Sequence, residues 1–151
     1  MASGPAPAPT QEDWMGGYRF LEHEDEAGIE AWGQDMAEAF AQAAEGLFAL
    51  MVVHEGIEER ASRQVEVTAP DAEALLVEWL NELLFLFETE GWLFRRFAIR
   101  EISDTALEAE GYGEHWDPGR HLLRLGVKAA TYHETQVERD GECRVQIIVD
   151  V

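Results

Sequence analysis

Residues 75–94, "LLVEWLNELLFLFETEGWLF", join a helical pattern to the beginning of a strand. The apolar residues of the first part recur at spacings of three and four, which is typical of an amphipathic helix. They are Leu76, Trp79, Leu80, Leu83, Leu84 and Phe87. Because this stripe is wide, we expect the helix to be the central buried one. Asp71 is positioned to cap its start, and Gly91 to end it.

Outside this helix the pattern predicts one more helix and several strands. A stripe from Met36 to Met51 predicts an amphipathic helix over residues 35–52, with Asp35 as its N-cap. Period-two alternation and turn residues predict the strands, which are "YRFLEH", "AGIEAWG", "RQVEVTAP", "WLFRRFAIREI", "ALEAEGYG", "VKAATYHETQVE" and "CRVQIIVDV". The segment "RDGE" predicts a hairpin turn before the last strand. This order predicts an α+β fold, a single domain with two helices packed on a mainly antiparallel sheet.

Length and composition predict one folded domain. The chain has 151 residues, 46% of them hydrophobic, which is enough for one proper core. The Pro/Ala-rich residues 1–17 predict a disordered tail, and residues 18–151 the domain. No apolar run approaches the roughly 18 residues of a membrane helix, and no signal peptide is apparent. The single cysteine, Cys143, forms no internal disulfide and fits a reducing cytoplasm.

The charge of the chain limits its partners. With 31 acidic residues against 11 lysines and arginines, the formal net charge is −20. Such a chain is a poor direct binder of RNA, DNA or anionic membranes. Cations or a basic protein face are the partners that the charge allows, although simple solubility or a salt-adapted cytoplasm explains it as well.

Two groups of carboxylates are candidate metal ligands. Residues 22–26, "EHEDE", place His23 among four acids, and hard cations such as Ca²⁺ prefer several carboxylate oxygens. A transition metal would also use His23. The spacing matches no EF-hand or zinc pattern, so a solvated acidic loop is the favoured interpretation. At the other end, Asp150 and the terminal carboxylate of Val151 follow a well-formed strand and could complete an oxygen-rich site.

The segment "RLGVKAATYHE", residues 124–134, holds a further polar group. Alternation puts Lys128 and Tyr132 on one face of the strand and His133 on the other, which argues against a Tyr–His catalytic pair. Lys128, the chain's single lysine, is expected to neutralise nearby carboxylates. Cys143 falls on the core face of the last strand and is not expected to act as a nucleophile. The chain contains no P-loop, nucleophile elbow, GxGxxG or HExxH.

Taken together, four segments resemble the archease family: "FLEH....GIEAWG", "LLVEWLNELLFLFETEGWLF", "LRLGVKAATYHE" and the ending "IIVDV". The resemblance covers residues 18–151. It implies a protein cofactor rather than an enzyme, one that assists the RtcB-type RNA-splicing ligase in tRNA splicing and RNA repair. Such a protein promotes ligase guanylylation and multiple turnover, and the net charge of this chain argues against direct contact with nucleic acid.

The resemblance also implies a metal site, most simply for Ca²⁺, formed by Glu26, Asp150 and Val151. Asp25 and His23 are alternative ligands, because this chain has Glu26 where the family usually has aspartate. Lys128 and His133 are then expected to support this end or to face the partner. Two other functions stay open from the residues alone: a small metal-dependent hydrolase that uses the same carboxylates, and a chaperone-like protein-interaction module.

Overall fold

The computed structural model describes residues 16–22 and 26–151 of the chain. The predicted tail falls almost wholly outside the described residues. The described elements, in chain order, are β1 (Gly17–Glu22), β2 (Glu26–Gly33), α1 (Met36–Met51), the 3₁₀ turn η2 (His54–Gly56), β3 (Ala61–Thr68), α2 (Ala72–Glu90), β4 (Trp92–Ile102), β5 (Ala106–His115), β6 (Ala129–Asp140) and β7 (Glu142–Asp150). Within the described ranges, neither helix is long and apolar enough to cross a membrane.

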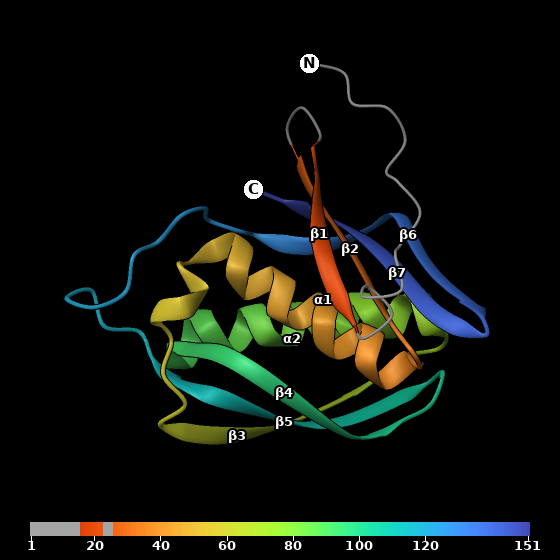
Figure 1. Ribbon diagram of the computed structural model, residues 1–151, viewed down its shortest axis with the longest axis horizontal. Helices are drawn as coiled ribbons and strands as arrows, with labels where there is room; N and C mark the ends of the chain where they lie inside the picture. The colour runs from red at the N-terminus through yellow and green to blue at the C-terminus, as the bar shows by residue number, and fades with distance from the viewer. Residues whose placement is uncertain (1–15, 23–25) are drawn as a thin grey trace.

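The strands form two antiparallel sheets, and the two helices lie between them (Figure 1). One sheet has the order β1–β2–β7–β6, and the other has the order β3–β5–β4. The predicted α+β domain with two helices on antiparallel strands is confirmed. Its division into two sheets is a feature that the sequence pattern did not indicate, because β7 pairs with β2 and β6 while β5 pairs with β3 and β4.

Local capping interactions explain where both helices begin and where α2 ends. The Asp35 carboxylate accepts a hydrogen bond from the Glu38 amide at 2.9 Å, and Asp71 accepts one from the Ala74 amide at 2.8 Å. Helix α2 ends at Gly91, whose φ of 76° lies in the left-handed region that suits glycine. All three capping predictions are therefore confirmed.

The core lies between the two sheets and contains the predicted apolar stripes of both helices. Trp79 of α2 is fully buried, and its indole Nε1 donates to the Phe40 carbonyl of α1 at 3.0 Å. Its ring also meets the ring of Phe97 from β4 edge-on, with centroids 5.4 Å apart. Trp79 thus joins both helices and the three-stranded sheet, as expected for a side chain of the central helix.

Strand β6 differs most from its predicted form. It spans Ala129–Asp140 instead of residues 127–138, so Lys128 precedes it. Its pairing with β7 is interrupted between Thr131 and Gln136, where Glu134 has a φ of 54°. The sequence did not reveal this bulge, because residues 132–135 contain no glycine or proline that would mark an interruption of the strand.

Candidate functional site

The paired ends of β2, β7 and β6 bring together the residues that the sequence analysis nominated. Ile29 and Ile147 are fully buried cross-strand partners, and their register places Glu26 directly opposite Asp150. Residues directly opposite each other on antiparallel strands direct their side chains to the same face. The Glu26 and Asp150 carboxylates therefore lie on the face opposite to that of the buried Ile29 and Ile147.

The chain segment before β6 completes this end of the sheet. The Lys128 amide donates to the Asp150 carbonyl at 2.8 Å, and Ala129 pairs with Asp150 in the sheet. The Lys128 side chain is exposed, and no ion pair joins it to a carboxylate of the described residues. Val151 follows directly, with 37% of its surface exposed. Main-chain contacts thus hold Lys128 beside Asp150, although the side chain does not neutralise a carboxylate there.

Three of the nominated residues are not placed at this end. His23 and Asp25 lie outside the described residues. His133 lies in the bulge of β6, and its imidazole is exposed, with Nε2 3.8 Å from a carboxylate oxygen of Glu134. The structure therefore brings together Glu26, Asp150, Val151 and Lys128, and it leaves His133 further along β6.

The donor set fits a hard cation in part. Two carboxylates directly opposite each other repel unless a cation lies between them, and Ca²⁺ takes six to eight oxygen ligands. Across residues 16–22 and 26–151, no three His, Cys, Asp or Glu side chains form a group that could hold a metal ion. A cation held by Glu26 and Asp150 would therefore need further oxygens, such as a main-chain oxygen of Val151 and water.

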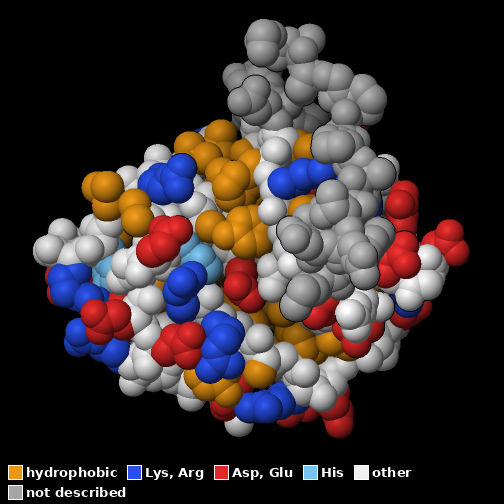
Figure 2. Space-filling model, in the orientation of Figure 1, with side chains coloured by type: hydrophobic (Ala, Val, Ile, Leu, Met, Phe, Trp, Pro, Cys, Tyr) orange, Lys and Arg blue, Asp and Glu red, His pale blue; other side chains and the backbone are white. Residues whose placement is uncertain are grey.

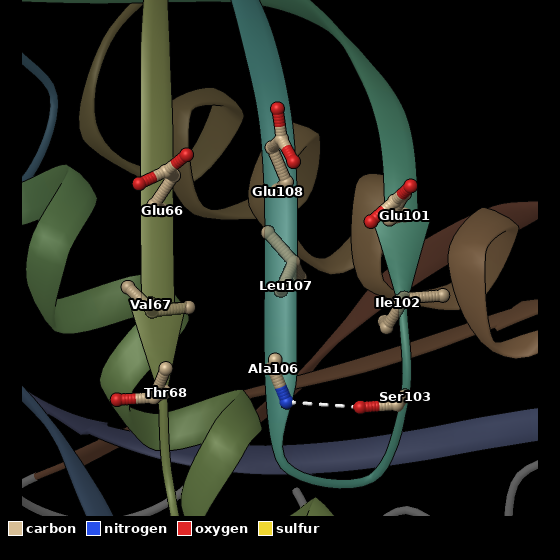
Figure 3. A pocket seen from close by; sticks show the side chains of 9 residues that line it. All are labelled: Glu66, Val67, Thr68, Glu101, Ile102, Ser103, Ala106, Leu107 and Glu108. Carbon is tan, nitrogen blue, oxygen red and sulfur yellow. Dashed lines mark hydrogen bonds between the residues drawn. The ribbon is translucent and has the colours of Figure 1, made fainter.

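A shallow pocket of about 560 Å³ lies in the other sheet, across β3, β5 and β4 (Figure 3). Glu66, Glu108 and Glu101 are aligned across the three strands by the pairing register. The Ser103 hydroxyl accepts from the Ala106 amide at 3.2 Å and closes the turn beside them. An aligned row of carboxylates on a sheet surface is no catalytic arrangement by itself, and the nominated residues that the structure describes lie in or next to the strands of the other, four-stranded sheet.

A buried carboxylate fixes the loop that leads to Lys128. Glu114, with 6% of its surface exposed, accepts hydrogen bonds from the Glu58 amide at 2.6 Å, from Arg120 and from His121. The Asp117 amide donates to His121 Nδ1 at 2.8 Å, so the ring proton lies on Nε2, which faces Glu114 at 3.1 Å. Burial raises the pKa of Glu114, but these hydrogen bonds outweigh it and lower the pKa to about 2.

Sequence reasoning missed this network. Glu114 and Glu58 are far apart in the chain, and the segment 116–128 has no periodic pattern that would place its side chains. The pair Leu122 and Leu123, apolar residues inside a run of turn residues, marks the segment as unusual but does not indicate the Glu114 network. By contrast, the interpretation of Cys143 as a core residue is confirmed, since it is buried and burial raises its pKa to about 11.

The model of the archease protein family matches residues 18–151. The chain belongs to the archease family. It is 35% identical to the archease of Sulfurisphaera tokodaii over 136 residues, covering 89% of this chain and 98% of that protein. It is 36% identical to the archease of Pyrococcus abyssi over 140 residues, covering 89% and 98%.

Solved structures agree with this archease membership. The solution structure of a Methanobacterium thermoautotrophicum protein superimposes with a TM-score of 0.74 at 33% identity, covering 89% of this chain and 99% of that one. A Thermotoga maritima protein, described as an archease and possible chaperone, superimposes with a TM-score of 0.55 at 17% identity, covering 87% and 94%. This second likeness supports the archease fold alone.

A half-buried carboxylate of α1 gives one pH-dependent prediction. Burial raises the pKa of Glu45 to about 7, although Arg95 and Arg96 of β4 lower it. The native state therefore loses stability as pH rises from about 4.5 to about 7 and the buried carboxyl ionises. Glu45→Gln is expected to raise the free energy of unfolding by about 2 kcal/mol at pH 8 and to leave it nearly unchanged at pH 4.

Urea unfolding of both proteins at pH 4 and pH 8 measures this difference. Glu88→Gln, at an exposed position of α2, is the matched control and should give equal stability changes at both pH values. A Glu45→Gln effect that does not depend on pH would contradict the buried-carboxylate explanation.

Proposed function

We propose that this archease is an activator of an RtcB-type RNA-splicing ligase and not itself an enzyme. Family membership supports the proposal, and the observation that carries it is the placement of Glu26 opposite Asp150, with Lys128 held beside them by the main chain. In this proposal the protein promotes ligase guanylylation and multiple turnover during tRNA splicing and RNA repair. Its place of action is the cytoplasm, which the single buried Cys143 suits.

The chemistry of this end follows from its residues. Glu26 and Asp150 present two carboxylates on one face of the sheet, and the main chain of Lys128 is held beside Asp150. We assign Glu26, Asp150 and a main-chain oxygen of Val151 as the ligands of a divalent cation. Three oxygen donors suit a hard cation, and we choose Ca²⁺ because it accepts a more flexible ligand geometry than Mg²⁺ does. When bound, the cation would neutralise the two carboxylates and supply a positive charge at the partner-facing end.

The net charge of −20 supports a protein partner over direct contact with RNA. A ligase that binds RNA has a basic surface, and an acidic activator is attracted to that surface without itself binding the RNA backbone. His133, exposed further along β6, is proposed to face the same partner. The protein then acts by docking its carboxylate end near the ligase active site.

A guanylylation time course tests this proposal. The host's ligase is incubated with GTP and a divalent metal, with and without substoichiometric amounts of this protein. We expect a large increase in rate that Asp150→Ala and Glu26→Ala each abolish. Asp140→Ala removes an exposed carboxylate at the opposite end of β6 and should stimulate as well as the wild type.

The same variants separate the rival functions. A folded Asp150→Ala protein that still stimulates the ligase fully would refute the role of the carboxylate end. Turnover of phosphodiester substrates without any ligase would favour a metal-dependent hydrolase. Protection of unrelated unfolded proteins, independent of Asp150, would favour a general chaperone. Ca²⁺ binding is read separately, as a Ca²⁺-dependent rise in melting temperature that Asp150→Ala removes.

A further inference from the structure

The segment between β5 and β6, residues 116–128, lies against the end of α1 in a fixed conformation. The Arg124 amide donates to the Met51 carbonyl at 2.7 Å, and the Val53 amide donates to the Leu122 carbonyl at 3.2 Å. Val52 and Leu123 form an isolated antiparallel bridge. The Glu114 network holds Arg120 and His121, so that residues 120–124 are fixed against the end of α1 and the residues that follow it. A preformed segment loses little conformational entropy when it binds a partner.

Three apolar side chains of this region point into solvent. Leu122 is 66% exposed, Leu123 is 50% exposed and Val53 is 37% exposed. The main-chain contacts above place all three side by side, and we call them the leucine patch. Leu122 and Leu123 are exposed although their main chain is held by contacts with residues 51–53, so they do not contribute to the core of the domain. Clustered exposed apolar residues of this kind are typical of protein interaction sites.

The charges next to the leucine patch are unusual for this chain. Eight arginines form ion pairs with described carboxylates: Arg19, Arg60, Arg63, Arg96, Arg100, Arg120, Arg139 and Arg144. Of the three other cations, Arg95 is hydrogen-bonded to His54 Nδ1 at 2.8 Å, whereas Arg124 and Lys128 are exposed and form no ion pair with any described residue. A chain with a net charge of −20 thus keeps two unpaired cations on one short segment, directly after two exposed leucines.

The leucine patch is continuous with the carboxylate end of the four-stranded sheet. The same segment runs from Leu122 to Lys128, whose amide is bonded to the Asp150 carbonyl. Figure 2 shows hydrophobic side chains on the side of the molecule where Figure 1 places the loop before β6, with cationic side chains next to them. A partner that contacts Lys128 and Asp150 can therefore reach the leucine patch with the same surface.

We propose that Leu122, Leu123, Val53 and Arg124 form a docking surface for a segment of the partner protein that carries apolar and acidic side chains. This inference rests on the proposed function, because the partner is the ligase proposed there. The leucines fill an apolar depression of the partner, and Arg124 pairs with its carboxylates. The carboxylate end then meets the basic active site of the same partner.

A protein segment fits this surface better than RNA does. Leucine side chains gain free energy by leaving water against other apolar atoms, and a phosphate backbone offers none. Arg124 and Lys128 are two cations in a chain whose net charge repels polyanions. The chemistry of the leucine patch therefore favours a protein partner, and RNA binding becomes one of the outcomes that the experiment must distinguish.

The experiment compares matched variants of the full chain for binding to the host's ligase and for stimulation of guanylylation. Leu122→Ser/Leu123→Ser removes the apolar contact, and Leu122→Ala/Leu123→Ala is a milder second version. Phe85→Ser, at a 55% exposed position of α2, is the control for losing an exposed apolar side chain. Arg124→Glu tests the charge, with Arg63→Glu on the other sheet as its control. Circular dichroism verifies that each variant is folded.

We expect the leucine variants to weaken ligase binding at least tenfold and Phe85→Ser less than twofold. At saturating concentrations the leucine variants should stimulate guanylylation fully, because the carboxylate end is intact. Arg124→Glu should weaken binding at low salt, and the loss should shrink as salt is raised.

The contrary outcomes are distinct. If the wild type stimulates the ligase and the leucine variants bind it as tightly as the wild type, the docking surface is refuted while the proposed function stands. If the wild type neither binds nor stimulates, both fail. If Arg124→Glu abolishes binding to a labelled single-stranded RNA but leaves ligase binding unchanged, the surface belongs to RNA and the inference is overturned.

Discussion

Replacing Trp79 with alanine is expected to lower the free energy of unfolding by about 5 kcal/mol. Trp79 is fully buried between the two sheets, and its loss removes contacts with both helices and with β4. The cavity would be bounded by packed elements that cannot collapse into it. For a domain of this size such a loss lowers the melting temperature by about 15 °C.

Urea unfolding followed by far-UV circular dichroism measures the effect. Trp79→Phe retains much of the apolar burial and loses the hydrogen bond to the Phe40 carbonyl, so it should cost only about 1–2 kcal/mol. Phe85→Ala, at an exposed position of the same helix, should cost less than about 1 kcal/mol. A small effect of Trp79→Ala, similar to that of Phe85→Ala, would show that α2 is not the central helix of the core.

Replacing Glu114 with glutamine is expected to cost about 3 kcal/mol at pH 7 and much less at pH 2. The Glu114 carboxylate accepts hydrogen bonds from the Glu58 amide, Arg120 and His121, and these lower its pKa from about 4.5 to about 2. A carboxyl group with a lowered native pKa contributes its full stability above the unfolded pKa. That contribution is lost progressively as pH falls from about 4.5 to about 2.

Stability measured between pH 2 and pH 7 tests this second prediction. The wild type should lose stability steeply between pH 4.5 and pH 2, and Glu114→Gln should lose less over the same interval. Glu110→Gln on the same strand is a suitable control, because Glu110 is more exposed and its partners Arg100 and Tyr112 lie at the surface. If the wild type and Glu114→Gln lose the same amount of stability between pH 4.5 and pH 2, the network does not stabilise the loop.

The elements of the fold could be predicted from local patterns. The stripe around Trp79, the caps Asp35 and Asp71 and the left-handed Gly91 are features of neighbouring residues, so the sequence determines them locally. The two sheets could not be predicted in this way. The pairing of β2 with β7 joins residues more than a hundred positions apart. The alternation of apolar and polar residues in a strand does not indicate which other strand it pairs with.

The candidate site could likewise be predicted only in part. Resemblance to the family nominated Glu26 and Asp150, and the strand register supplies the physical reason that they meet. The Glu114 network and the leucine patch had no such signal, since both depend on the non-periodic segment 116–128. Their positions result from tertiary contacts with α1 and β5, which a pattern of single residues does not encode.

The position of β7 inside its sheet also has a consequence for synthesis on the ribosome. Strand β7 is bonded to β2 on one side and to β6 on the other, and residues 34–141 separate β2 from β7 in the chain. The ribosome therefore needs roughly ten seconds after synthesising β1 and β2 to synthesise β7, and until then the edge of β2 that pairs with β7 has no hydrogen-bonding partner there. During that interval Ile29 and Ala31 lack their cover from β7, which exposes the growing chain to wrong pairings that the finished protein avoids.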